Sequence, residues 1–203
     1  MNRLIIIGAS GHGKVVADIA RLSGYTDIAF LDDAPGLEVV SGYPVLGVVS
    51  TFFAYLQDDF FVAIGNSDSR RRIQDEIASS GARLVTLIHP SAVVAKDVVI
   101  GEGTAVMAGA VINPSVRIGR GCIVNTSASV DHDCVIGDFA HISVGAHLAG
   151  TVSIGYGTWV GIGAVVSNNI SICSDCMIGA GAVVVKNINV GGKFYGIPAA
   201  KRD

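Results

Sequence analysis

The chain has 203 residues, of which 50% are hydrophobic and 15% are charged, and its formal net charge is −3. It lacks the clustered lysines and arginines of a nucleic-acid-binding protein. It also lacks apolar runs of the roughly 18 residues that a membrane helix needs and, at its start, the pattern of a signal peptide. This composition predicts a cytoplasmic globular protein of one or two domains.

The N-terminal part of the chain alternates between short apolar strands and helices, which is typical of a small parallel α/β sheet. The expected strands are 4–8, 28–33, 60–65 and 84–89. The expected helices are 14–23, with Val15, Val16, Ile19 and Leu22 on one face, and 66–81, closed by Gly81. The basic run Arg70-Arg71-Arg72 lies in the second helix, and we interpret it as a solvated face rather than a phosphate site.

The first strand ends in a glycine-rich turn, GASGHG at 8–13, which opens the first helix. Its pattern G-x-x-G-x-G differs from the dinucleotide-binding pattern G-x-G-x-x-G. Backbone N–H groups at the start of a helix nevertheless bind anions, and the carboxyl ends of parallel strands hold ribose or base. His12, Asp32, Asp33 and Gly65 lie at such ends, which favours nucleotide-sugar binding; the alternative is a tight packing turn.

From Val94 to Val190, Val, Ile or Leu occupies every sixth position without a break. A series of mostly small residues lies two positions earlier, and glycine often follows the aliphatic residue, as in Ile100-Gly101 and Ile118-Gly119. This period predicts a triangular β-helix of about five coils, in which each six-residue unit forms one short strand and one corner. The aliphatic residues point inward and stack on their counterparts in the next coil.

The cysteines fit this repeat better than they fit a reactive site. Cys122, Cys134 and Cys176 fall in the series of small inward residues, so we interpret them as packing thiols. The segment CSDC at 173–176 has CxxC spacing, but no second Cys/His pair accompanies it, as a zinc site would require.

A polar block around His132 interrupts the outward wall of the repeat. His132 follows the inward Val130 by two residues and has an aspartate on each side, and His141 and His147 follow further along. A neighbouring carboxylate can orient an imidazole and raise its basicity, as a general base requires. On spacing alone, an ordinary surface or subunit-interface histidine is an equal alternative.

Several of these segments together resemble the NeuD/PglD family, which comprises sialic-acid O-acetyltransferases and UDP-4-amino-sugar N-acetyltransferases. The matching segments are GASGHG at 8–13, FLDD at 30–33, IGN at 64–66, NTSASVDHDCVIGDFAHISVGAHLAG at 125–150 and YGIPAAKR at 195–202. The resemblance implies a Rossmann-like nucleotide-sugar-binding domain over 1–85 and a left-handed β-helix with a C-terminal extension over 86–203. It also implies a homotrimer that binds acetyl-CoA between neighbouring β-helices and needs no metal.

Carried over by position, the resemblance makes His132 the general base and Asp133 the carboxylate that increases its basicity. Residues that would line the acetyl-CoA site are Asn125, His141, Gly150 and Ile162, with the Gly150 N–H offered to the thioester oxygen. Residues that would hold the nucleotide sugar are Ser10, Gly11, His12, Asp32, Asp33 and Gly65. The family carries Glu after the histidine, whereas this chain carries the shorter Asp133, which changes the geometry of the pair.

The implied reaction is direct transfer of an acetyl group to a nucleotide-linked 4-amino sugar in bacterial glycan biosynthesis, without an acyl-enzyme. A sialic-acid hydroxyl is the alternative acceptor, and the nucleotide could be UDP, GDP or dTDP. Two other classes remain open. One is a trimeric zinc enzyme that uses His132, His141 and His147, as γ-class carbonic anhydrases use three histidines. The other is a non-catalytic scaffold that binds sugar nucleotides.

Overall fold

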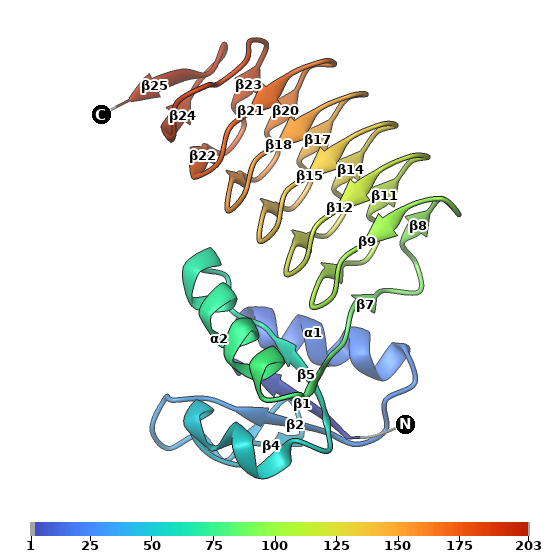
Figure 1. Ribbon diagram of the computed structural model, residues 1–203, viewed down its shortest axis with the longest axis vertical. Coiled ribbons are helices and arrows are strands. Elements are labelled where there is room, and N and C mark those ends of the chain that lie inside the picture. Colours follow the sequence, from blue (N-terminus) through green and yellow to red (C-terminus); the bar gives the residue numbers. More distant parts are fainter. Residues whose placement is uncertain (1–2, 203) are drawn as a thin grey trace. The chain divides into compact units, whose positions relative to one another are not determined.

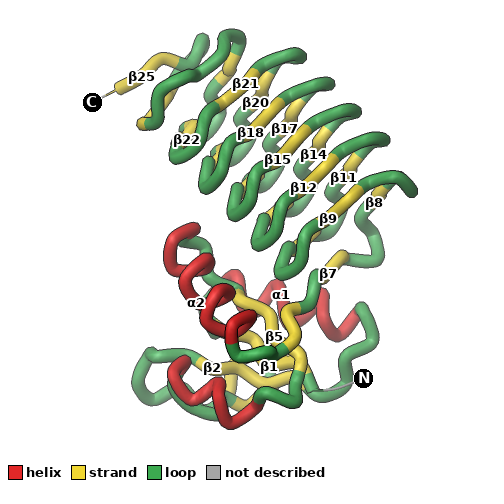
Figure 2. The backbone as a smooth tube through the Cα atoms, viewed as in Figure 1, coloured by secondary structure: helices red, strands yellow, loops and turns green. Residues whose placement is uncertain are grey.

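The computed structural model describes residues 3–202, which fall into two compact units that separate after Pro90 (Figure 1). The first unit contains α-helices and a parallel sheet, and the second is a coil of short strands (Figure 2). Within the described residues, no helix is long and apolar enough to cross a membrane.

The first unit is built on a four-stranded parallel sheet with the order β2-β1-β5-β6. Its strands are β1 (Leu4–Ile7), β2 (Ile28–Leu31), β5 (Asp59–Val62) and β6 (Arg83–Leu84), and its helices are α1 (Gly11–Leu22) and α2 (Ser67–Ser79). Every residue of β1, β2 and β5 is buried, as expected for parallel strands that are covered on both faces. This confirms the predicted α/β sheet.

Several details of the first unit differ from the prediction. The expected strand at 84–89 is divided between β6 and a second short strand, β7 (Leu87–Ile88). The expected face of α1 is wrong at both ends, because Val15 is 44% exposed and Leu22 is 41% exposed. The buried face consists mainly of small residues, Gly13, Val16, Ala17, Ile19 and Ala20, whose spacing follows the helical period.

The connection between β2 and β5 contains elements that the sequence did not predict. A short antiparallel pair, β3 (Val39–Val40) and β4 (Tyr43–Pro44), is followed by the 3₁₀ helix η1 (Val49–Tyr55). Phe52 of η1 is buried and belongs to the core of this unit. The segment is therefore an integral part of the first unit rather than a free loop.

The second unit is a parallel β-helix with three walls and about six turns. The first wall consists of β8 (Val93–Val94), β11 (Val111–Ile112), β14 (Ser129–Val130), β17 (His147–Leu148), β20 (Val165–Val166) and β23 (Val183–Val184). The second consists of β9 (Val99–Ile100), β12 (Arg117–Ile118), β15 (Val135–Ile136), β18 (Ser153–Ile154) and β21 (Ser171–Ile172). The third includes β10 (Ala105–Val106), β13 (Ile123–Val124), β16 (His141–Ile142), β19 (Trp159–Val160), β22 (Cys176–Ile178) and β24 (Gly192–Tyr195).

The six-residue period predicts the interior of this β-helix correctly. Ile118 pairs with Ile100 below it and with Ile136 above it, and the aliphatic series is buried from Val106 to Val184. Cys122, Cys134 and Cys176 are buried in the same core, as predicted. The series fails at its last member, because Val190 is 65% exposed.

The predicted number of coils was too low, because the chain continues the third wall beyond the repeat. β24 adds to β22 in parallel, and β25 (Ala200–Arg202) pairs with β24 in antiparallel orientation. Phe194 of β24 is buried against the β-helix core. The C-terminal extension therefore completes the end of the β-helix.

Candidate active site

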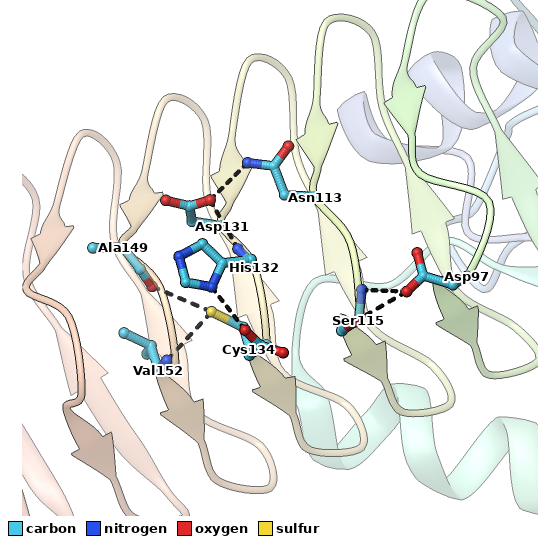
Figure 3. A network of polar contacts seen from close by, with 9 residues as sticks. Asp97, Asn113, Ser115, Asp131, His132, Cys134, Ala149 and Val152 are labelled. Atoms are coloured by element: carbon cyan, nitrogen blue, oxygen red, sulfur yellow. Dashed lines mark hydrogen bonds and ion pairs between the residues drawn. The ribbon is translucent and has the colours of Figure 1, made fainter.

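His132 lies in the corner that follows β14 of the first wall, with its ring exposed (Figure 3). Its Nδ1 lies 2.8 Å from Oδ2 of Asp133. This contact, followed by the charge of Asp131, raises the pKa of His132 above its usual value. When Nδ1–H donates to the carboxylate, Nε2 carries the lone pair that can accept a proton. The pair therefore has the arrangement of a general base and its orienting carboxylate.

A second carboxylate, that of Asp131, lies on the other side of the histidine. Its Oδ1 accepts hydrogen bonds from Nδ2 of Asn113 at 2.7 Å and from the backbone N–H of His132 at 2.8 Å (Figure 3). The bond from Asn113, followed by the bond from the His132 backbone, lowers the pKa of Asp131. Asp131 is therefore held as a carboxylate beside the candidate base.

Gly150 provides the space in which the ring of His132 lies. A Cβ atom at Gly150 would lie 2.6 Å from both Cε1 and Nε2 of His132, which is closer than any side chain can approach. The absence of a side chain at Gly150 is thus a requirement for the observed position of the imidazole.

A pocket of about 450 Å³ opens on the first wall beside this corner. Its lining includes Asn113, Ser129, Asp131, His147, Val165 and Ser167. Ser129 and His147 contact one another, with Oγ and Nδ1 2.8 Å apart. The residues that line the pocket include a carboxylate and no lysine or arginine, so the pocket presents polar groups without fixed positive charge.

Three of the four residues expected to contact acetyl-CoA, Asn125, His141 and Ile162, lie on the third wall or in the corners that follow it, whereas Gly150 lies beside His132. Nδ2 of Asn125 lies 3.1 Å from Nε2 of His141. The ring of His141 stacks on Trp159 of the next coil, with centroids 5.3 Å apart and planes 13° apart, and Nε1 of Trp159 donates to Oγ of Ser143. Ile162 is 60% exposed in the corner after β19. We call Asn125, His141, Ser143, Trp159 and Ile162 the His141 cluster. Its central ring is that of His141, which contacts both Asn125 and Trp159.

The structure brings the predicted residues of the β-helix together in two groups. His132 contacts Asp133 and Gly150, and Asn125 contacts His141. The first group lies at the corner between the first and second walls, whereas the second lies at the third wall. Because the two groups lie on different sides of one triangular prism, a single β-helix presents them as separate surfaces.

The expected nucleotide-sugar residues surround the glycine turn of the first unit, but the aspartates bind backbone there. Oδ2 of Asp32 accepts from the N–H of Ala9 at 2.6 Å, and Oδ1 accepts from the N–H of Ala34. Asp33 accepts from the N–H of Val49. Ser10 and Gly11 are exposed at the start of α1, and Gly65 is exposed after β5. Asp32 therefore braces the turn, while the backbone of the turn stays accessible.

Arg70 lies within this region as a buried group, and His12 lies there half-buried. Arg70 is 1% exposed and donates from Nη1 to the carbonyl oxygens of Ile64 and Gly65, both at 2.8 Å. The interpretation of the basic run as a solvated face is thus wrong for Arg70. Burial, followed by the nearby charge of Arg70, lowers the pKa of His12 to about 4. His12 is therefore neutral near neutral pH, and its buried Nε2 has no hydrogen-bond partner among the described residues.

Three contacts of the site were not predicted from the sequence, although the six-residue repeat contained a signal for two of them. Asn113 precedes Asp131 by 18 residues, and Trp159 follows His141 by one coil. Residues at this spacing occupy the same position in adjacent coils, so polar or aromatic pairs could have been read from the sequence. Ser143, the partner of Trp159, carried no such signal.

The three histidines considered as zinc ligands lie on different elements of the β-helix. His132 lies in a corner, His141 on β16 of the third wall and His147 on β17 of the first wall. Between residues 3 and 202, no group of three or more His, Cys, Asp or Glu side chains is arranged to hold a metal ion.

Comparisons with known proteins cover both units. Residues 3–77 match the family model of the PglD N-terminal domain. The acetyltransferase domain of PglB from Neisseria gonorrhoeae is 42% identical, with a TM-score of 0.95 over 100% of both chains, and has a structure in complex with acetyl coenzyme A. PerB from Caulobacter crescentus, in complex with CoA and GDP-perosamine, is 39% identical, with a TM-score of 0.94 over 100% of this chain and 98% of that one.

A curated relative gives a shorter match. The UDP-N-acetylbacillosamine N-acetyltransferase of Bacillus subtilis is 38% identical over 115 residues, which are 53% of this chain and 52% of the relative. The match to this chain thus spans about half the length of the curated relatives.

Proposed function

Because the chain belongs to the PglD family of left-handed β-helix sugar acetyltransferases, we propose that it transfers the acetyl group of acetyl-CoA to the amine of a nucleotide-linked 4-amino sugar. The structural relatives named for complexes with acetyl-CoA, or with CoA and GDP-perosamine, support both substrates. The names of two curated relatives, for bacillosamine and perosamine N-acetylation, support nitrogen rather than oxygen as the acceptor atom.

The observation that carries this proposal is the open Nε2 of a histidine whose Nδ1 is fixed by Asp133 at 2.8 Å. In the proposed reaction, the two substrates are held side by side, and proximity supplies much of the rate enhancement. His132 removes a proton from the acceptor amine, and the amine nitrogen attacks the thioester carbon. The backbone N–H of Gly150 stabilises the oxyanion that forms.

The active site is proposed to be completed by a neighbouring subunit of a homotrimer. His132 and the His141 cluster lie at different edges of one β-helix, so packing three β-helices side by side can bring the edge of one against the edge of the next. The exposed apolar side chains of Trp159 and Ile162 would then contact the pantetheine chain of acetyl-CoA between subunits, together with Asn125 and His141.

The first unit is proposed to hold the nucleotide of the acceptor. Backbone N–H groups around Ser10 and Gly11 would bind the phosphates at the start of α1. His12, Asp32, Asp33 and Gly65 would shape the site around the sugar and base. A cytoplasmic location belongs to this proposal, since acetyl-CoA and nucleotide sugars are cytoplasmic metabolites.

The test is a thiol-release assay with acetyl-CoA and a panel of UDP-, GDP- and dTDP-linked 4-amino sugars. We expect turnover with at least one amino sugar, and we expect His132→Ala to lower kcat by about 10²- to 10⁴-fold. Calorimetry should show that the variant still binds acetyl-CoA. Near-normal turnover by His132→Ala would refute the role of His132, and acetylation of sialic acid alone would replace the proposed acceptor.

A further inference from the structure

Asp131 presents one carboxylate oxygen that the fold does not use, beside the ring nitrogen proposed to accept a proton. Asn113 and the backbone N–H of His132 both bind Oδ1 of Asp131, and Oδ2 has no hydrogen-bond partner among the described residues. In Figure 3, this free oxygen and the ring nitrogen of His132 that is not bound to Asp133 point toward the same side.

We propose that Asp131 binds the acceptor amine as an ammonium ion and thereby selects amines over hydroxyl acceptors. This inference rests on the proposed acetyl transfer, and it assigns to Asp131 a contact with substrate that is separate from the role of Asp133. Asn113 acts as the positioning residue, because its amide binds Oδ1 and leaves Oδ2 free, while Asp131 lines the pocket on the first wall.

The charges around the pocket fit a cationic acceptor group. Asp131 lines the pocket, Asp133 lies on the other side of His132, and the lining contains no lysine or arginine. An aliphatic amine is largely protonated near neutral pH, and a charge-assisted hydrogen bond to a carboxylate is about twice as strong as a neutral one. An acceptor that carries its own carboxylate, such as a sialic acid, would instead be repelled.

An ammonium ion bound in this way requires a base, which His132 supplies. The imidazole removes one proton from R–NH3+ and becomes imidazolium, and the resulting amine attacks the thioester carbon to form the C–N bond. When the C–S bond breaks, the thiolate of CoA takes the proton from the imidazolium. The nitrogen loses its second proton to solvent, so the products are the amide, the free thiol and one proton.

Asp97 is another aspartate of the β-helix, and its carboxylate serves only to stabilise a corner. Its Oδ2 accepts from both the N–H and Oγ of Ser115, at 2.8 and 3.1 Å (Figure 3). It is therefore a matched control for Asp131: each carboxylate binds a residue in an adjacent coil, but Asp97 does not line the pocket.

The experiment compares wild type, Asp131→Asn and Asp97→Asn in steady-state assays of the full chain with its amino-sugar acceptor. Asparagine keeps an oxygen for Asn113 and removes the charge. We expect Asp131→Asn to raise the KM for the amino sugar by about 10- to 100-fold, with the KM for acetyl-CoA within about twofold of wild type. Asp97→Asn should match wild type in both constants.

Two further readouts separate ammonium binding from a structural effect. The deficit of Asp131→Asn should shrink as the pH rises from about 8 to 9.5, because a neutral amine no longer needs the carboxylate. The inhibition constant of the matching 4-hydroxy nucleotide sugar should change by less than about twofold, because that ligand has no ammonium group.

An acceptor KM that is unchanged in Asp131→Asn, a deficit that does not depend on pH, or an equal loss of affinity for the 4-hydroxy sugar would overturn the inference while leaving the proposed acetyl transfer intact. Failure of the wild-type protein to acetylate any amino sugar would overturn the proposed function itself. Failure of the inference is therefore seen in the Asp131→Asn variant, and failure of the proposed function is seen in the wild-type protein.

Discussion

The imidazole of His132 lies over Gly150 of the next coil, where a Cβ atom would come within 2.6 Å of the ring. Replacing Gly150 with alanine should push the ring away from its contact with Asp133, because the far end of a side chain moves more easily than the backbone. We expect Gly150→Ala to lower kcat by roughly tenfold or more, with little change in Tm. Steady-state kinetics and thermal unfolding measure the two effects.

Gly137→Ala is the matched control for this substitution. Its Cβ would meet the backbone N of Tyr156 at 2.8 Å, so the strain would fall on the β-helix itself and not on a catalytic ring. We expect a clearly lower Tm for Gly137→Ala than for Gly150→Ala. An equal loss of Tm in both variants, with normal kcat for Gly150→Ala, would show that Gly150 serves packing alone.

Asp133 should set the acidic limb of the pH profile. Its hydrogen bond is the largest cause of the raised pKa of His132. Activity requires neutral His132, so kcat/KM should fall as the pH drops through this raised pKa, which lies above the usual 6.5. In Asp133→Asn the limb should move to lower pH, toward 6.5.

The backbone tolerates this substitution, because Asp133 has a φ of 58°, a conformation that asparagine adopts readily. Asn169 has a φ of 59° in the same type of corner. Profiles of kcat/KM against pH for the two proteins give the measurement. An acidic limb at the same pH in both proteins would mean that Asp133 does not raise the pKa of His132.

The interior of the β-helix could be predicted from the sequence because each coil repeats the same requirement: one inward aliphatic residue in every six. The face of α1 could not be predicted as well, since Val15 and Leu22 are large but exposed, whereas Ala17 and Ala20 are small and buried. Tight packing of this helix against the sheet selects small residues, and apolar size alone points to the wrong face.

The contacts of the candidate site in the first unit were likewise only partly predictable from the sequence. Arg70 has the spacing of a buried position, with Ile73, Gln74 and Ile77 on the same face, but its charge favoured a solvated interpretation. Its burial depends on the carbonyl groups of Ile64 and Gly65, which no sequence pattern places. The contact of Asp32 with Ala9 likewise depends on the path of the glycine turn.

Trp159 should control the affinity for acetyl-CoA through the ring of His141. The two rings stack with their planes 13° apart, and such a contact is worth about 0.5–1.5 kcal/mol, or roughly two- to tenfold in a binding constant. We expect Trp159→Leu to raise the KM for acetyl-CoA by that factor, with the KM for the amino sugar unchanged.

Met177→Leu is the control for this variant, because Met177 pairs with Trp159 on the other side from His141. It should leave both KM values near those of wild type. If Trp159→Leu instead changes the KM of the amino sugar alone, the His141 cluster belongs to the acceptor site, and the assignment of Asn125 and His141 to acetyl-CoA is wrong.

His12 should make the protein less stable in acid. Burial holds its pKa at about 4 in the folded chain, against 6.5 for a free histidine. Between these values the unfolded chain binds more protons than the folded one, so stability falls as the pH drops from 6.5 toward 4. Each pKa unit corresponds to about 1.4 kcal/mol, so the loss amounts to roughly 3 kcal/mol at most.

His12→Asn removes this titration, so its urea midpoint should fall less than that of wild type over this pH range. The urea midpoint of His132→Asn should fall more than that of wild type over the same range, because the raised pKa of His132 stabilises the folded chain in acid. Urea denaturation of the three proteins at several pH values measures both slopes. If wild type and His12→Asn lose stability in parallel, His12 is not held neutral by burial, and its ring is accessible to a proton as well as to a ligand.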